Sequence, residues 1–110
     1  MNDEIKKYLS DILTSAEAID IHLGEKKNFN EYLNNFTVRR AVERELEIIG
    51  EAMQRILKIQ PGIAISKARL IIDLRNKVIH AYDVVDDAII WKIISKDIPV
   101  LKAEVEKLLE

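Results

Sequence analysis

Cysteine is absent from this chain, and glycine and proline are scarce. The absence of cysteine excludes disulfide bonds and zinc sites built from thiolates. Because the chain has only three glycines and two prolines, few positions interrupt a regular backbone, and we expect long regular elements. No apolar run approaches the roughly 20 residues that span a bilayer, and the first ten residues lack the apolar run of a signal peptide. We therefore expect a cytoplasmic protein that does not enter a membrane.

The overall charge is close to balanced, with 17 basic and 19 acidic residues and a formal net charge of −2. This balance argues against a protein that coats nucleic acid through its bulk charge, although a local basic patch can still dock a phosphate backbone. Hydrophobic residues make up 48% of the chain and charged residues 33%, which is typical of a folded globular protein. With 110 residues, we expect one domain, residues 1–110.

Apolar residues recur at steps of three and four along most of the chain, which is the period of an amphipathic helix. The predicted helices cover residues 5–23, a short stretch from 28, residues 38–58, a stretch from about 66, and a last one that follows the aspartates at 83–87. Gly24 ends the first helix, and Pro99 must kink the last one or mark a restart, because proline cannot donate a helical hydrogen bond. The pattern contains no strand signal, so we predict an all-α bundle of four or five helices.

Residues 74–82, "LRNKVIHAY", place polar side chains in an otherwise apolar stretch. At 100° per residue, Arg75 and Tyr82 lie on an apolar stripe, and Asn76 and His80 form a polar stripe beside it. A buried arginine needs a carboxylate or phosphate partner, because an unpaired guanidinium in a core costs several kcal/mol. Helical projection makes Glu45 a candidate. A purely structural interpretation is therefore an Arg75–Glu45 ion pair in the core or in a dimer interface.

The two histidines also have structural interpretations. His80 near a helix end is compatible with a surface or capping residue, and favourable interaction with the helix dipole explains His22 at the end of the first helix. The two histidines lie in separate segments and make a poor ligand set for a metal ion. Asp83, Asp86 and Asp87 more simply cap the last helix. We therefore expect no metal site and no cofactor.

Charged residues fall into two different groups. In one group, arginines alternate with glutamates, which predicts a solvated face that pairs with itself: Arg39, Arg40, Arg44 and Arg55 with Glu43, Glu47 and Glu51. In the other group, the basic residues from 67 to 77 oppose only Asp73. This local positive charge surrounds the motif and offers contacts to an RNA backbone through Lys67, Arg69 and Lys77.

An arginine and a histidine in a basic setting suit the cleavage of RNA by its own 2′-hydroxyl. His80, with an intrinsic pKa near 6.5, can transfer a proton, and Arg75 can hold the non-bridging phosphate oxygens. Such a mechanism needs no metal. Positions 75 and 80 project about 140° apart on a continuous helix, so the helix must end or distort near His80, or two chains must share the site. A symmetric homodimer would bring two copies of His80 together and supply both an acid and a base.

The segment from Arg75 to Tyr82 carries the signature R-x4-H-x-Y with an asparagine after the arginine, and it resembles the HEPN superfamily. More narrowly, it resembles the HepT-like toxins, which are paired with a minimal nucleotidyltransferase antitoxin. Residues 39–56 and 97–109 are also similar to that family, so the resemblance covers nearly the whole chain.

The resemblance implies an all-helical homodimer with the motif in a cleft at the dimer interface, and a metal-independent endoribonuclease. By position, Arg75 and His80 would be catalytic, and Asn76 would orient them or the phosphate. Tyr82 would receive AMP from ATP through the nucleotidyltransferase, which would block the RNA cleft. A structural interpretation of Tyr82, a half-buried aromatic near the interface, is compatible with that role.

Two other functions stay open at this stage. The chain could be a non-catalytic helical dimer that binds a nucleotide or docks a nucleotidyltransferase through the same cleft. It could also be a purely structural dimeric bundle, in which case substitution of Arg75 or His80 would have no functional effect.

Overall fold

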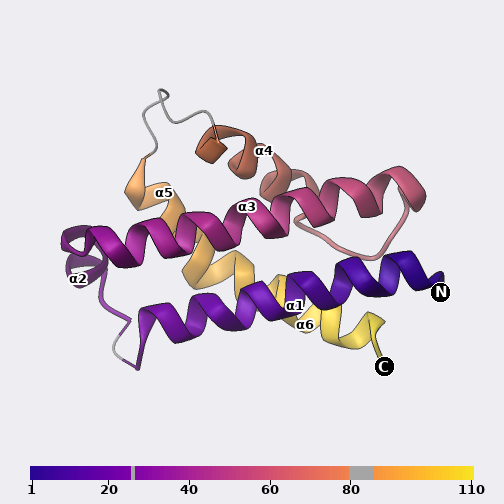
Figure 1. The fold of residues 1–110 in the computed structure, drawn as a ribbon, viewed down its shortest axis with the longest axis horizontal. Coiled ribbons are helices and arrows are strands. Elements are labelled where there is room, and N and C mark those ends of the chain that lie inside the picture. Colours follow the sequence, from indigo (N-terminus) through magenta and orange to yellow (C-terminus); the bar gives the residue numbers. More distant parts are fainter. Residues whose placement is uncertain (26, 80–85) are drawn as a thin grey trace.

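The computed structural model describes residues 1–25, 27–79 and 86–110, and these residues form helices joined by turns (Figure 1). The first four helices are α1 (Asp3–Leu23), α2 (Phe29–Asn34), α3 (Phe36–Ile59) and α4 (Ala68–Ile79). The remaining three segments follow one another without a break: α5 (Asp87–Lys92), the π-helix η1 (Ile93–Asp97) and α6 (Ile98–Leu108). No strand occurs in these three ranges. The predicted all-α class is confirmed.

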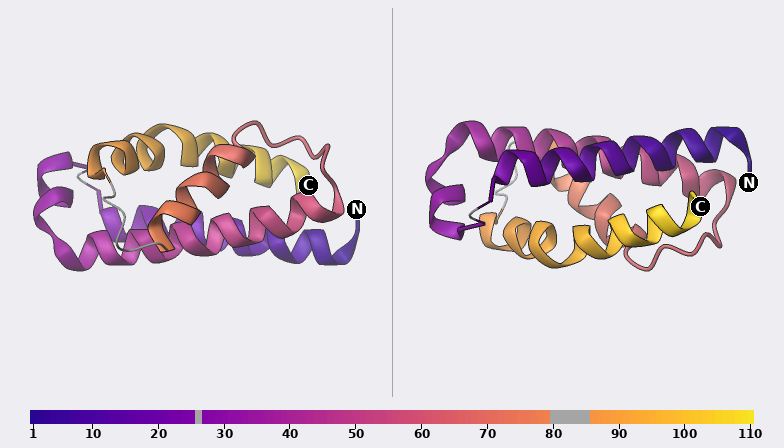
Figure 2. Two further views of the ribbon diagram at one scale, coloured as in Figure 1. Left: turned by 90° about the horizontal axis from the view of Figure 1, so that it is seen from above. Right: turned by 90° about the horizontal axis from the view of Figure 1, so that it is seen from below.

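The long helices α1 and α3 lie side by side along the long axis of the molecule, and α2 sits at one end of α3 (Figures 1 and 2). Helix α4 packs on α3 on the side away from α1. The α5–η1–α6 segment packs on α1 through α6. None of the helices formed by the described residues is long and apolar enough to cross a membrane.

The core is built from the apolar stripes of these helices. In α3 every predicted stripe residue is at most 1% exposed: Val42, Leu46, Ile49, Met53 and Ile56. The matching stripe of α1 is also buried and includes Ile5, Leu9, Ile12, Ala16 and Ile19. The helical period in the sequence therefore predicted the buried face of both long helices.

Asparagine side chains begin the first three helices. Asn28 accepts a hydrogen bond from the Glu31 amide at 3.2 Å, so the predicted start of α2 is confirmed. Asn35 accepts one from the Val38 amide at 3.0 Å, which begins α3 two residues before the predicted position. Gly24 follows α1 with φ +72°, a left-handed conformation that glycine adopts without strain.

Pro99 marks a restart of the last helix, as predicted. It lies in the first turn of α6, directly after the π-helix. Proline has no N–H, so it cannot bond to the carbonyl one turn earlier, and the hydrogen-bond pattern shifts there. Ile93, Ile94 and Ile98 stay buried across the shift, so the irregular turn keeps the apolar face of the segment towards the core.

Candidate active site

Arg75 lies on the side of α4 that faces α3. Its neighbours Ile71, Ile72, Leu74 and Val78 are buried, and Arg75 itself is half-buried. The side chain passes directly over Gly50 of α3. A β-carbon at position 50 would overlap Cβ and Cγ of Arg75 and would lie 3.3 Å from the Ile71 carbonyl oxygen. Glycine at position 50 therefore makes room for the arginine of the motif.

Among the described residues, Arg75 has one polar side-chain contact and no carboxylate partner. Nη1 donates a hydrogen bond to Oδ1 of the neighbouring Asn76 at 3.1 Å. Nε is buried and has no hydrogen-bond partner among the described residues. Within residues 1–25, 27–79 and 86–110, Arg75 forms no ion pair with a carboxylate. A buried donor without a partner favours an anionic ligand.

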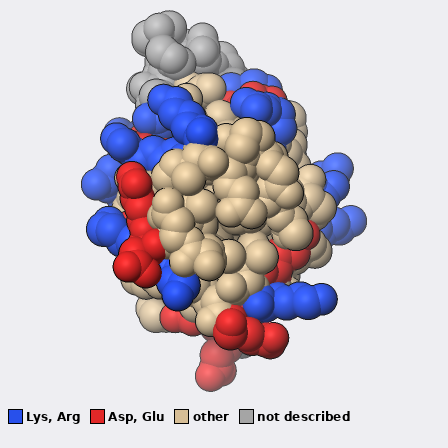
Figure 3. All heavy atoms as spheres, turned by 90° about the vertical axis from the view of Figure 1, so that its right-hand side faces the viewer, with Lys and Arg blue, Asp and Glu red and all other residues tan. Residues whose placement is uncertain are grey.

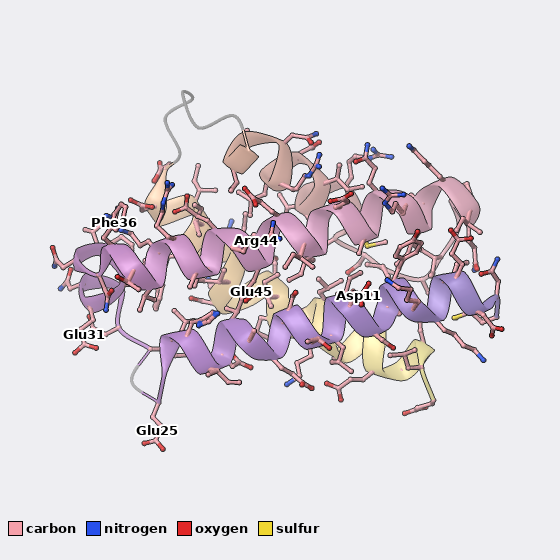
Figure 4. All side chains as sticks on the ribbon, in the orientation of Figure 1. Asp11, Glu25, Glu31, Phe36, Arg44 and Glu45 are labelled. Atoms are coloured by element: carbon pink, nitrogen blue, oxygen red, sulfur yellow. The ribbon has the colours of Figure 1, made fainter. Side chains whose placement is uncertain are left out.

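Within one chain, the predicted ion pair between Arg75 and Glu45 is wrong. Oε2 of Glu45 lies 3.1 Å from Nε2 of His22, so this carboxylate faces α1 (Figure 4). Positions 45 and 50 project about 140° apart on α3, and Gly50 is the residue that faces α4. His22 lies in the last turn of α1, where the helix dipole was expected to explain it, but Glu45 is its partner as well.

The other two residues of the motif, His80 and Tyr82, lie outside the described residues, as does Asp83. The description resumes at Asp86, whose carboxylate accepts hydrogen bonds from the amides of Ala88 at 2.8 Å and Ile89 at 3.4 Å. The predicted cap of the last helix is therefore confirmed for Asp86.

Asp87 was also predicted to cap the last helix, but its carboxylate pairs with an arginine of α3 instead. Its Oδ2 lies 3.2 Å from Nη1 of Arg39, and both side chains are half-buried. The predicted self-pairing of the α3 surface holds for the other three arginines, which pair with glutamates three or four residues away: Arg40 with Glu43, Arg44 with Glu47, and Arg55 with Glu51. Arg39 instead connects α3 to the first turn of α5.

Two ionisable side chains near the Arg39–Asp87 ion pair, the half-buried Glu43 and the buried Tyr32, have raised pKa values. Burial raises the pKa of the Glu43 carboxyl above its usual value, and the nearby Asp87 carboxylate adds to this rise while Arg40 and Arg39 oppose it. Burial also raises the pKa of the Tyr32 phenol, with smaller contributions from Asp87 and Glu43. The phenol is therefore neutral at physiological pH.

The basic surround of the motif is exposed. Lys67, Arg69 and Lys77 are all on the surface, and none of them forms an ion pair with another described residue. Figure 3 views the molecule from the end that carries the N-terminus and shows basic side chains around most of its outline, several of them in the upper part. The described residues contain no group of three histidine, aspartate or glutamate side chains that could hold a metal ion.

Gly50 is the part of this site that the sequence analysis missed. A glycine inside a helix costs about 1 kcal/mol relative to alanine, so its presence in the otherwise strong helical pattern of residues 38–58 indicates a close approach of another element. That signal does not say which element approaches.

The family model named "Ribonuclease HepT-like" matches residues 3–108. The chain belongs to the ribonuclease HepT-like family. The match covers all the described helices, and the resemblance drawn from the motif is confirmed.

Curated relatives agree with this assignment. A protein of Methanocaldococcus jannaschii named "Putative RNase MJ1380" is 38% identical over 104 residues, which are 94% of each chain. A protein of Thermococcus cleftensis named "Probable ribonuclease HepT" is 38% identical over 107 residues, again 94% of each chain. No solved structure matches the chain.

Proposed function

We propose that this protein is the toxin of a toxin–antitoxin pair and acts as a metal-independent endoribonuclease. The observation that carries the proposal is the half-buried guanidinium of Arg75, which has no carboxylate partner among the described residues and lies in a chain of the ribonuclease HepT-like family. The names of the relatives, which describe ribonucleases, support RNA cleavage by this chain. The exposed basic residues of α4 and the preceding turn suit contacts to an RNA backbone.

In the proposed reaction, the 2′-hydroxyl of a ribose attacks the adjacent phosphorus. A base takes the proton of that hydroxyl, and an acid gives a proton to the departing 5′-oxygen, which leaves a cyclic phosphate and a new 5′-hydroxyl. His80 is the proton-transfer group, and its counterpart in a second protomer supplies the other of the two roles. Arg75, oriented by Asn76, stabilises the charge that develops on the non-bridging oxygens.

The two histidines of the chain allow a matched test. We expect the purified protein to cleave single-stranded RNA in the presence of EDTA. We expect His80→Ala to abolish cleavage and His22→Ala to retain it, because His22 pairs with Glu45 in the α1–α3 contact and lies outside the motif. Far-UV circular dichroism would show that both variants are folded. Cleavage that persists in His80→Ala would overturn the proposal, and RNA binding without any cleavage by the wild-type protein would favour the non-catalytic alternative.

The proposal includes a partner. A nucleotidyltransferase antitoxin would transfer AMP from ATP to the Tyr82 hydroxyl with release of pyrophosphate, and the added bulk and negative charge would keep RNA out of the cleft. Co-expression with a minimal nucleotidyltransferase antitoxin should add one or more AMP moieties to Tyr82, as measured by peptide mass spectrometry. Tyr82→Phe should escape both the modification and the inhibition. Modification at another residue with Tyr82 untouched would contradict this assignment.

A further inference from the structure

A large aromatic side chain is exposed at the start of α3. Phe36 is 65% exposed, and Figure 4 labels it at the end of the molecule where α2 and α3 meet. Two guanidinium groups approach its ring: the central carbon of Arg39 lies 5.9 Å from the ring centroid, and that of Arg40 lies 5.5 Å away. Asn34, Asn35 and Thr37 beside it are polar and exposed.

The two arginines differ in how firmly they are held. Arg39 is 28% exposed and pairs with Asp87 of α5 at 3.2 Å. This ion pair holds the Arg39 guanidinium in place beside the Phe36 ring. Arg40 is 63% exposed, and its nearest contact to Glu43 is 3.8 Å. A long ion pair at the surface contributes little, so the guanidinium of Arg40 is available to another anion.

The ion pair between Arg39 and Asp87 connects this surface to α5, the helix that follows the motif in the sequence. Asp87 is the first residue of α5, and Asp86, the cap of that helix, directly follows the segment 80–85 that contains His80 and Tyr82. A nucleic acid strand held at the motif has charged backbone groups on both sides of the reacting phosphate. Arg39 contacts the Phe36 ring and also pairs with Asp87 of α5. The surface formed by Phe36 and Arg40 is therefore linked to the helix that follows the motif.

We propose that Phe36 and Arg40 form a binding site for one unpaired nucleotide of a single-stranded RNA, outside the catalytic motif. The base stacks on the Phe36 ring and the adjoining phosphate pairs with Arg40. This inference rests on the proposed ribonuclease function, because it supplies a substrate contact for that reaction. Stacking accepts any base, so the site increases affinity without selecting a sequence.

The chemistry of this surface favours RNA over a protein partner. Protein interfaces have an apolar core with a polar rim, whereas Phe36 is flanked by exposed Asn35 and Thr37 and by two guanidinium groups. Leu33, 38% exposed on α2, is the exposed apolar residue that precedes it in the sequence. An aromatic ring with an adjacent guanidinium matches the repeating unit of a nucleic acid, which has a flat base next to a phosphate.

Binding can be measured without cleavage in full-length protein that carries His80→Ala. We expect Phe36→Leu to weaken the binding of a fluorescent single-stranded RNA about five-fold or more, and Phe36→Tyr, which retains the ring, to restore wild-type affinity. Ile21→Ala is the matched control, because Ile21 is an even more exposed apolar residue, at 77%, on α1. It should leave the affinity unchanged.

The salt dependence of binding tests the phosphate contact separately. Arg40→Gln should lower the slope of log Kd against log salt concentration by about 0.7, the value for one phosphate of a single strand. Phe36→Leu should leave that slope unchanged. Arg55→Gln is the control, because Arg55 is also exposed, at 55%, and paired with a glutamate on the same helix.

Further measurements test this proposal and separate it from the proposed function. Without the His80→Ala change, Phe36→Leu should raise KM for RNA and leave kcat unchanged. If the protein cleaves RNA and Phe36→Leu alters neither KM nor affinity, the nucleotide site is wrong and the ribonuclease stands. If the protein binds RNA through Phe36 but never cleaves it, the site stands and the ribonuclease is wrong. If Phe36→Leu changes only the monomer–dimer equilibrium in sedimentation experiments, this surface is a protein interface and the proposal is overturned.

Discussion

Gly50 and Arg75 are in direct contact between α3 and α4, and this contact decides where the guanidinium of the motif lies. In Gly50→Ala the added methyl overlaps two side-chain carbons of Arg75, so the arginine or the whole of α4 must shift. A displacement of about 1 Å at a catalytic group can lower the rate about 100-fold. We therefore expect Gly50→Ala to reduce RNA cleavage by at least about ten-fold.

Gly62→Ala is the control for this substitution. Gly62 has no atom within 4 Å of an added β-carbon, so alanine at that position should change neither cleavage nor folding. Urea denaturation would show that Gly50→Ala remains folded, because alanine gains about 1 kcal/mol of helix propensity, which offsets part of the steric cost. A Gly50→Ala protein with the wild-type cleavage rate would show that position 50 does not set the position of Arg75.

Tyr32 has a buried hydroxyl with no hydrogen-bond partner among the described residues. The residue is 3% exposed, and its ring packs against Trp91 with 5.4 Å between centroids. Tyr32→Phe keeps the ring and removes the unsatisfied group, whose burial typically costs about 1–3 kcal/mol. We expect the free energy of unfolding in urea to rise or stay level. A clear loss of stability would mean that the hydroxyl has a partner in solution, such as a bound water.

Among the secondary-structure elements, α5 is the first described helix after the motif. Asp86 caps α5 through two backbone amides, and loss of an aspartate cap typically lowers stability by about 1 kcal/mol. Asp86→Ala should therefore lower the free energy of unfolding by about that amount, whereas Asp86→Asn, which keeps the accepting oxygen, should stay near the wild-type value. Equal destabilisation by the two variants would indicate that charge, and not the cap, is what matters at this position.

The boundaries of the elements show how far local patterns reach. The end of α1 at Gly24 and the restart at Pro99 were predictable, because both follow from backbone properties of a single residue. The start of α4 was not. Ser66 was the predicted start, but its amide and hydroxyl both bond to the carboxylate of Glu104 on α6, and the helix begins at Ala68. That partner is distant in sequence, so a local pattern could not identify it.

At the scale of the whole molecule, one protomer offers only one histidine in the motif. If two protomers share the active site, the cleavage rate per chain should fall when the protein is diluted below the dissociation constant of the dimer. Sedimentation equilibrium would give that constant independently. The cleavage rate per chain and the fraction of dimer should then fall together as the protein is diluted. A constant rate per chain in a solution that sediments as monomer would show that a single protomer is sufficient for cleavage.

The sequence by itself determined the helical class, the buried stripes of α1 and α3, and the motif that the family match supports. Each of these depends on residues close together in the chain, where the helical period fixes which side chains share a face. Tertiary structure decided which helix covers each face. It placed Glu45 against His22, Gly50 under Arg75, and Asp87 against Arg39. These pairings join residues 23 or more positions apart, and only the packing of whole helices determines which of them meet.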